Sequence, residues 1–433
     1  MIAALAALAD DTAASGASRP SPGVLDSLAT HVSEDLPSWW KMGIEFRGRC
    51  EDYRGLNGIA GFDDAYCLTR LRLSSTFSVR PWLHIFAQAQ DSRAIGYDRR
   101  PVPSTVADTV DLRQAYVEAG VLGEQGWAAR AGRQPLVFGD MRMVSTSNWS
   151  NVGTAFDGVR LSHTGGRTHL DWFATAAVVP TAGFDRPRTD RKLSGFYSST
   201  AVRKNLVLDL YFFWKSNLGT TDERGHTGTL DAYTYGLRST GKVAYGFDYN
   251  IEAALQRGHR VQDPLSAAVS HLELGHPLWT GKAPRVWLEY NYATGDSNPH
   301  DGRRQTFEQL YPTPWSVVGR AADFAWRNIH EPMAGVEWQL DRRWKFRATY
   351  RAFWLANTND SLYTLSGASF ARNPNAAHSR VGEETGLWSI FQATRRLQFW
   401  LGYANLTPGP YLKESSHPGP IRYPFAVWTY NAL

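Results

Sequence analysis

Arginine side chains recur through one stretch of the sequence, with carboxylates placed among them. This stretch contains Arg113, Arg130, Arg133, Arg142 and Arg160, together with Asp140 and Asp157. None of the spacings matches a catalytic carboxylate pair, a metal-binding motif or a phosphate-binding loop. A planar guanidinium group can bind a carboxylate through two parallel hydrogen bonds, so a wall of arginines predicts recognition of anions rather than catalysis.

The segments that carry basic residues have the period of two that is typical of β-strands. Residues 344–354 are the clearest case, because Lys345, Arg347 and Arg351 alternate there with aromatic and small apolar residues. Successive side chains of a strand point to opposite faces, so such a segment separates an apolar surface from a cationic one.

Eighteen segments between Trp39 and the C-terminus have this alternation. We expect strands at 41–50, 66–79, 81–94, 109–122, 126–134, 154–163, 167–179, 192–202, 205–216, 229–240, 245–258, 265–276, 284–294, 332–340, 344–357, 383–393, 396–405 and 421–433. Sixteen strands is the alternative count. Tight turns follow the even-numbered strands, whereas long polar loops mostly follow the odd-numbered ones, the longest being 135–153, 295–331 and 358–382. Outer-membrane barrels have this asymmetry, with short periplasmic turns and long extracellular loops.

Composition agrees with a membrane barrel. Aromatic residues make up 13% of the 433 residues, and no apolar run of about 18 residues exists that could form a transmembrane helix. A soluble barrel of so many strands would enclose more volume than its side chains can fill, whereas a barrel with lipid outside and water inside has no such difficulty. We therefore predict an all-β, transmembrane antiparallel barrel in the bacterial outer membrane.

In such a barrel the polar strand faces point inward. The basic residues that alternation places there are Arg47, Arg49, Arg70, Arg72, Arg160, Lys345, Arg347 and Arg351. The carboxylates placed there are Glu45, Glu118, Asp157, Asp209, Glu252 and Glu289. Arg113 lies out of phase with the inward face of its strand. A confined channel focuses the field of its charges, so the cationic surplus over the first six strands predicts passage of anions.

The first 37 residues are expected to lie outside the barrel, which we assign to residues 38–433. Ala7-Leu8-Ala9 before Asp10 fits the cleavage site of a signal peptide, and residues 10–37 have a composition typical of disorder. A frayed alanine-rich tail is the alternative for the first residues.

Cys50 and Cys67 bracket the first long loop. An oxidising periplasm would allow a disulfide between them, and two unpaired small hydrophobic residues are the alternative. No histidine or carboxylate motif predicts a metal site, and we expect no cofactor and no nucleic-acid partner.

Three blocks of the sequence resemble the alginate-export family of outer-membrane porins. They are Arg113-Gln114-Ala115-Tyr116 with Gly132-Arg133-Gln134, Phe138-Gly139-Asp140 with Arg142, Trp149-Ser150-Asn151 and Phe156-Asp157-Gly158; Tyr292-Ala293-Thr294-Gly295-Asp296 with Phe307 and Leu310-Tyr311-Pro312; and residues 402–411. The resemblance implies a monomeric eighteen-stranded barrel with an electropositive constriction through which an anionic uronic-acid polymer leaves the cell. It also implies that the 135–153 loop folds inward, with Arg113, Arg133, Arg142, Arg160 and Asp157 as candidates for the constriction.

We expect a non-catalytic porin for an anionic polysaccharide, in contact with outer-membrane lipid and open to a periplasmic secretion partner. Passive uptake of small anionic solutes or oligosaccharides is the alternative. A third class, a soluble β-protein that cleaves sugars, would need paired carboxylates across a cleft, and no such pair can be nominated.

Overall fold

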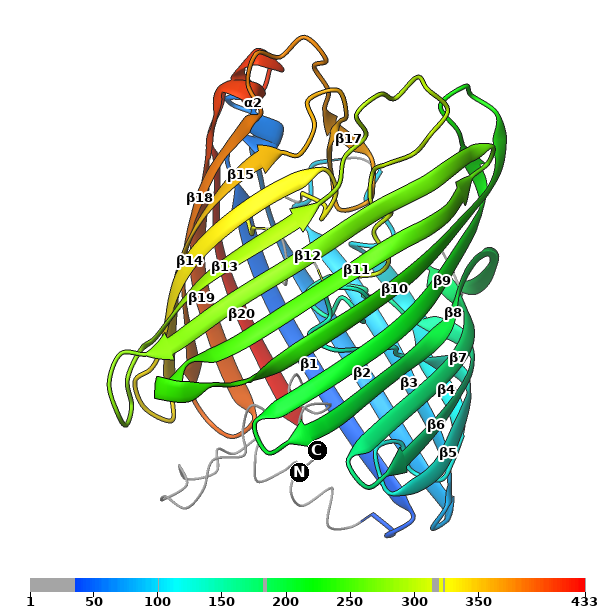
Figure 1. Ribbon diagram of the computed structural model, residues 1–433. Coiled ribbons are helices and arrows are strands. Elements are labelled where there is room, and N and C mark those ends of the chain that lie inside the picture. Colours follow the sequence, from blue (N-terminus) through cyan, green and yellow to red (C-terminus); the bar gives the residue numbers. More distant parts are fainter. Residues whose placement is uncertain (1–35, 100, 182–184, 314–318, 322–323, 433) are drawn as a thin grey trace.

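The chain folds into one closed barrel, described by a computed structural model for residues 36–433 except 100, 182–184, 314–318, 322–323 and 433. An 18-stranded antiparallel sheet closes where β1 (Trp40–Tyr53) pairs with β20 (Ile421–Ala432) (Figure 1). The predicted fold class and the count of eighteen strands are confirmed. The expected signal-peptide remnant lies outside the described residues and stays a prediction.

Each expected strand corresponds to one barrel strand. Between β1 and β20 these are β2 (Asp64–Arg80), β3 (Leu83–Ile95), β4 (Asp108–Ala119), β5 (Gly126–Gln134), β6 (Phe156–Gly165), β7 (Thr168–Val179), β8 (Arg186–Arg203), β9 (Leu206–Thr221), β10 (Thr227–Lys242), β11 (Asp248–Arg260), β12 (Asp263–Pro277), β13 (Arg285–Ala293), β14 (Ile329–Gln339), β15 (Trp344–Leu355), β18 (Arg380–Gln392) and β19 (Leu397–Pro408). The connections contain a small hairpin, β16 (Leu362–Tyr363) and β17 (Ser369–Ala371), and the short helices η1 (Leu56–Gly58), η2 (Ala244–Gly246) and α2 (Pro410–Glu414). None of the helices in the described part of the chain has the length and apolar character needed to cross a membrane.

Short and long connections lie at opposite ends of the barrel. The short ones are 81–82, 120–125, 166–167, 204–205, 243–247, 278–284, 340–343 and 393–396. The longest, 135–155, 294–328 and 356–379, start at the other end, which is at the top of Figure 1. Two connections on the long-loop side are short: residues 222–226 join β9 to β10, and residues 261–262 join β11 to β12 by a tight turn.

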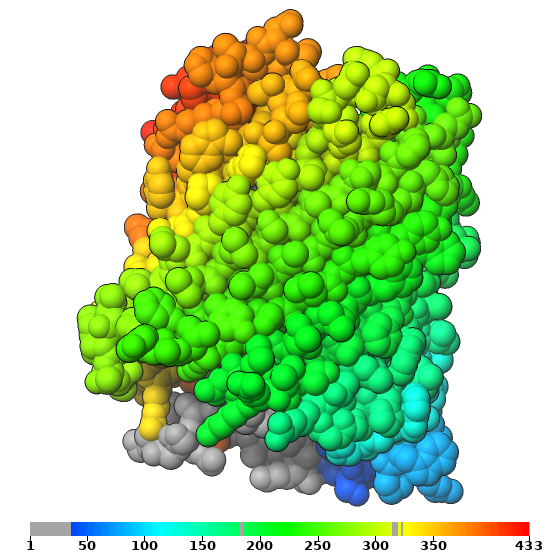
Figure 2. Space-filling view, viewed as in Figure 1, coloured from blue at the N-terminus to red at the C-terminus, as the bar shows by residue number. Residues whose placement is uncertain are grey.

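The outer surface of the barrel is apolar. Large hydrophobic side chains are exposed at alternate positions along the strands, as with Leu272 and Leu274 on β12. The side chains of neighbouring strands form a continuous outer wall (Figure 2). Exposed tryptophans gather near the short connections: Trp39, Trp82, Trp127, Trp279 and Trp344. Such a ring is typical of the membrane interface, where an indole has one apolar and one polar side.

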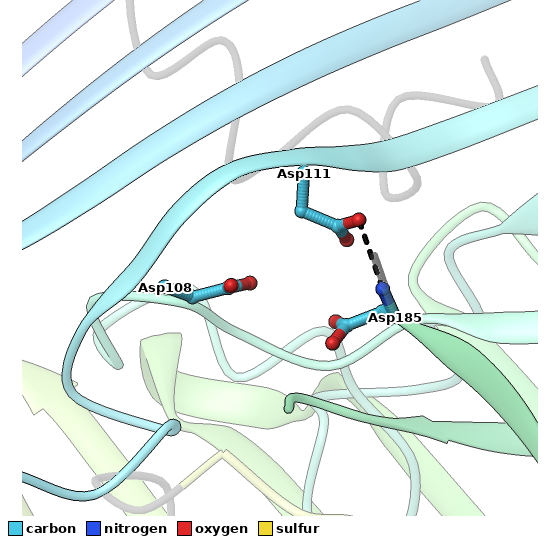
Figure 3. Close-up of side chains that lie close together, drawn as sticks. All are labelled: Asp108, Asp111 and Asp185. Atoms are coloured by element: carbon cyan, nitrogen blue, oxygen red, sulfur yellow. Dashed lines mark hydrogen bonds between the residues drawn. The ribbon is translucent and has the colours of Figure 1, made fainter. Parts of the chain in front are cut away.

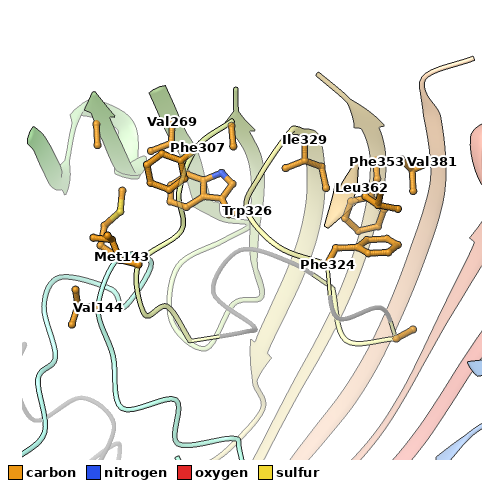
Figure 4. Packing of buried hydrophobic residues seen from close by; sticks show 14 of the residues in the cluster. Met143, Val144, Val269, Phe307, Phe324, Trp326, Ile329, Phe353, Leu362 and Val381 are labelled. Atoms are coloured by element: carbon orange, nitrogen blue, oxygen red, sulfur yellow. The ribbon is translucent and has the colours of Figure 1, made fainter. Parts of the chain in front are cut away.

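The buried apolar core lies inside the barrel, between the wall and two inserted connections. Met143 and Val144 of the 135–155 connection and Phe307 and Trp326 of the 294–328 connection are at most 3% exposed (Figure 4). The inward fold expected for the first of these connections is therefore present, and the second one joins it.

The two cysteines form a disulfide, Cys50–Cys67, between directly opposed residues of β1 and β2. Of the two alternatives left open by the sequence, the pairing is confirmed. The bridge closes the β1–β2 hairpin below the 54–63 connection, at the long-loop end of the barrel.

The sidedness of the barrel leads to a labelling prediction. A cysteine at Asn373, in the 356–379 connection, should react with a membrane-impermeant maleimide on intact cells, whereas one at Lys242, next to a short connection, should react only after permeabilisation. The wild-type protein is the control, because both of its cysteines are in the disulfide and have no free thiol. Labelling of Lys242→Cys on intact cells would contradict this orientation.

Candidate functional site

The strongest polar site inside the barrel holds the 135–155 connection against β1 to β4. Five arginines, which we call the arginine clamp, donate to its backbone and side-chain oxygens: Arg47, Arg49, Arg70, Arg72 and Arg113. Four of them were predicted on the inward face, and the structure places them there, 1–8% exposed. Their charge is directed at the inserted connection rather than at open solvent.

The contacts of the arginine clamp converge on a few carbonyl groups. The Asn148 carbonyl accepts from Arg47 Nη1 at 2.8 Å and Arg70 Nη1 at 3.0 Å, and the Trp149 carbonyl accepts from Arg49. Hydrogen bonds from charged donors each contribute about 1.5–3 kcal/mol, so this set is a strong local anchor. Arg70 also binds Glu45 at 2.6 Å, but among the described residues Arg47 has no carboxylate partner.

Arg113 reaches the inner face through a β-bulge. The pairing of β3 with β4 shifts between Gln88 and Ala89, so that Gln114 lies opposite Gln88 while Leu112 lies opposite Ala89. The extra residue is Arg113, whose Nη2 donates to the Thr154 carbonyl at 2.6 Å. A bulge inserts one residue and turns consecutive side chains to one face, which is why regular alternation placed Arg113 out of phase.

The same connection crosses the barrel to the opposite wall. Phe138 stacks on Tyr197 of β8 with ring centroids 4.9 Å apart, and Asp140 pairs with Arg238 of β10. Arg142 pairs with Asp140 and lies 3.8 Å from Glu289 of β13. Because these strands and β1 are far apart around the ring, residues 138–152 must pass through the interior.

At the tip of the crossing, two arginines compensate the negative charge of Asp140. Burial alone would raise the pKa of Asp140, but the guanidinium groups of Arg142 and Arg238 hold that pKa well below its usual range. Asp140 is therefore ionised at neutral pH and binds both arginines, so Arg142 anchors the crossing as a buried ion-pair partner.

The 294–328 connection meets the first one inside the barrel. The Ser145 N–H donates to the Tyr311 carbonyl at 2.7 Å, and the Tyr311 N–H donates to the Met143 carbonyl at 2.9 Å. These bonds form a short parallel bridge between Val144 and Tyr311. The two inserted connections thus act as one structural unit.

Three further predicted arginines lie on the inner face as members of ion pairs. Arg160 binds Asp171 through two bonds of 2.7 and 2.8 Å, Arg130 binds Glu118, and Arg351 binds Glu331 at 2.7 Å. The Arg160 and Arg351 pairs are almost wholly buried, so these arginines stabilise the wall.

Asp157 was predicted on the inward face, and the structure places it elsewhere. On β6, buried Arg160 and Ser162 alternate with exposed Val159 and Leu161, and Asp157 shares the face of the exposed pair. Arg133 lies directly opposite and binds it at 2.9 Å. Two residues three positions apart on a regular strand cannot face the same side, so this pair lies on the outer face near the long connections.

A second group on the inner face combines cations with indole rings. We call it the Arg–Trp band, and it consists of Trp287, Arg347, Trp388 and Trp400 on β13, β15, β18 and β19. The Arg347 guanidinium lies 4.6 Å from the ring centre of Trp287 and 5.4 Å from that of Trp388. Its side chain is 34% exposed, and it shares Glu337 with Lys345.

Alternation predicts the inward position of Lys345 and Arg347 but not that of the tryptophans in this region. Around Trp388 both faces of the strand are apolar, with Leu387 on one side and Ile390 on the other, so the period of two gives no inward assignment. Arg320, in the 294–328 connection, was also missed, and its guanidinium lies 3.9 Å from the ring centre of Trp388. Arg320 lies in a connection without strand alternation, so its contact with the Arg–Trp band depends on how that connection folds.

The profile of the alginate export family matches residues 38–418. The chain belongs to the alginate export family. The resemblance drawn from the sequence is thereby confirmed, and the barrel is an outer-membrane β-barrel of the porin type. No curated protein matches the sequence.

Solved porins share the fold of this family member. A BenF-like porin from Pseudomonas fluorescens Pf-5 superimposes with a TM-score of 0.63 at 9% identity, covering 91% of this chain and 99% of the other. OccK11 (OpdR) of Pseudomonas aeruginosa gives 0.62 at 10% identity, covering 91% and 96%. OpdK of the same organism, solved with vanillate, gives 0.62 at 11% identity, covering 92% and 98%. At these identities the likeness concerns the fold alone.

Proposed function

We propose that this member of the alginate export family is a non-catalytic channel for an acidic polysaccharide of the uronic-acid type, with export as its direction. The observation that carries the proposal is the Arg–Trp band. A uronic-acid residue has a carboxylate and a flat, partly apolar sugar ring, and Arg347 between Trp287 and Trp388 offers a cation beside indole faces.

The exposure of the band fits transient contact. Arg347 is one-third exposed and Trp388 and Trp400 are half-buried, whereas the arginine clamp is covered by the inserted connection. A solute that must pass needs sites that attract it without holding it, and partly exposed, partly paired cations meet that need. The pore-lining role predicted for Lys345 and Arg347 is therefore part of this proposal, while the arginine clamp has a holding role.

Channel recordings with oligosaccharides test the proposal. In planar bilayers, oligomannuronate added on the short-connection side should cause brief current blocks that lengthen with chain length, whereas neutral malto-oligosaccharides of equal length should cause few. Arg347→Gln and Trp388→Ala should each shorten the blocks, and Arg380→Gln, in an exposed pair with Glu383 at the other end, is the matched control. Equal blocking by the neutral sugars would contradict the proposal.

Uptake of small anionic solutes is a second candidate, and one observation favours it. Both inserted connections are packed inside the barrel, with Val144 and Trp326 at most 1% exposed, and such an obstruction restricts a polymer more than a small solute. Blocks by monomeric glucuronate as long as those by the oligomers would support this second function.

A further inference from the structure

Three carboxylates converge at the long-connection end of the barrel, outside the sites described above. Asp108 and Asp111 belong to β4, and Asp185 ends the 180–185 connection (Figure 3). One oxygen of each lies within 4.8 Å of the others. Asp108 and Asp111 are each 5% exposed.

An irregular start of β4 places two of these carboxylates on the same side. Residues three apart on a regular strand face opposite sides, but here the pairing with β3 shifts between Gln90 and Ser92. Val110 has a φ of 53°, a left-handed conformation that is rare for a β-branched residue. The chain thus accepts local strain where Asp108 and Asp111 are brought together.

The carboxylate of Asp108 points at the other two, and one of its oxygens has no hydrogen-bond partner in the part of the chain that the structure describes. This oxygen, Oδ1, is buried, and Asp108 as a whole is only 5% exposed. In Figure 3 it is directed towards Asp111 and Asp185. A buried ionised carboxylate without a donor is costly, so a cation that it could ligate would remove a large penalty.

The neighbours of the cluster supply too little positive charge. Asp111 accepts from the Asp185 N–H at 3.1 Å and lies 3.4 Å from Arg133 Nη1, and Arg133 is shared with Asp157. Within the described part of the chain, Arg133 is the one basic side chain in contact with the cluster, so three carboxylates face one shared guanidinium.

We propose that Asp108, Asp111 and Asp185 bind a divalent, oxygen-preferring cation, Ca²⁺. Calcium takes six to eight oxygen ligands in a flexible geometry, and three carboxylates from two segments, completed by carbonyls and water, fit that preference better than the strict octahedron of Mg²⁺. The cation would tie Asp185, directly before β8, to β4. This proposal is independent of what the channel transports.

The site lies next to an anchor of the inserted connection. The Asn151 side chain donates to the Val106 carbonyl at 2.9 Å, two residues before Asp108, and Arg113 follows two residues after Asp111. Calcium would therefore stiffen the segment of wall to which the 135–155 connection is bound.

Calcium titration of the refolded protein tests the proposal. The full chain, refolded from urea into detergent so that lipopolysaccharide is absent, is freed of metal with EDTA and titrated with CaCl₂ by calorimetry at pH 7.5. We expect saturable binding of one equivalent and a higher Tm with CaCl₂ than with EDTA, with MgCl₂ giving a smaller rise. Absence of saturable binding by the wild-type protein would overturn the site.

Variants separate this site from other carboxylates on the barrel. Asp108→Asn should abolish calcium binding and the calcium-dependent rise in Tm, and Asp185→Asn, in a connection, serves if the strand variant does not refold. Asp190→Asn, which removes an exposed carboxylate paired with Arg188, is the matched control and should bind as the wild type does. Unchanged calcium binding by both cluster variants would also overturn the proposal, as would a wild-type Tm insensitive to calcium but raised by Asp108→Asn.

Discussion

Replacing residues 139–153 by a short glycine–serine linker should raise the single-channel conductance several-fold. These residues include the crossing from the arginine clamp to Asp140 and Arg142, and the narrowest section of a pore governs its conductance. The strand pairing of the wall does not include them, because β5 and β6 pair with each other and with their neighbours through their own backbones. Recordings in planar bilayers at high salt measure the change.

A deletion of similar character in another connection provides the control. Replacing residues 373–377, an exposed part of the 356–379 connection, by the same linker should leave the conductance close to that of the wild type. Folding of both variants is checked by the mobility shift that heating causes in detergent gels. A conductance unchanged by the 139–153 replacement would mean that the crossing does not limit the pore.

The second large effect concerns ion selectivity. The wild-type channel should prefer anions, and the double variant Arg191→Glu with Arg347→Glu should weaken or reverse that preference. Arg191 is exposed on the face of β8 that also carries buried Leu193 and Tyr197, and among the described residues it has no ion-pair partner. A charge in a confined channel acts on every passing ion, so two reversals change the local potential strongly.

Reversal potentials under a KCl gradient measure this selectivity. Arg133→Gln is an informative control, because Arg133 lies on the outer face with Asp157 and its loss should leave the reversal potential unchanged. A cation-selective wild-type channel would contradict the proposed substrate class. A reversal potential that moves with Arg133→Gln would contradict the outer placement of this pair.

The strands and their order could be predicted from the sequence because alternation is a local property. A lipid-facing strand needs an apolar side chain at every second position, so segments such as 344–354 reveal both their extent and their faces. The alternation of short and long connections then fixes which end is which. The same pattern placed Cys50 and Cys67 at facing strand ends, where they are paired.

The arrangement of side chains and inserted connections inside the barrel could not be predicted from alternation. Alternation assumes a regular strand, and the bulge at Arg113 and the irregular start of β4 near Val110 break it. At Asp157 the prediction failed because alternation assigns every polar residue of a strand to the inward face. Near the rim of the barrel, however, the outer face also carries polar side chains. The arginine clamp and the tryptophans around Arg347 depend on loop positions that no local pattern encodes.

The bridge between Val144 and Tyr311 has a mechanical consequence. Its two connections arise from β5–β6 and from β13–β14, on nearly opposite arcs of the ring, so their backbone hydrogen bonds form a tie across the diameter. A single curved sheet resists stretching along its hydrogen bonds but flattens easily into an oval. With the tie in place, flattening would have to break the Ser145–Tyr311 and Tyr311–Met143 bonds. The tie therefore keeps the cross-section of the barrel round, and the lateral pressure of the surrounding bilayer changes the width of the channel only slightly.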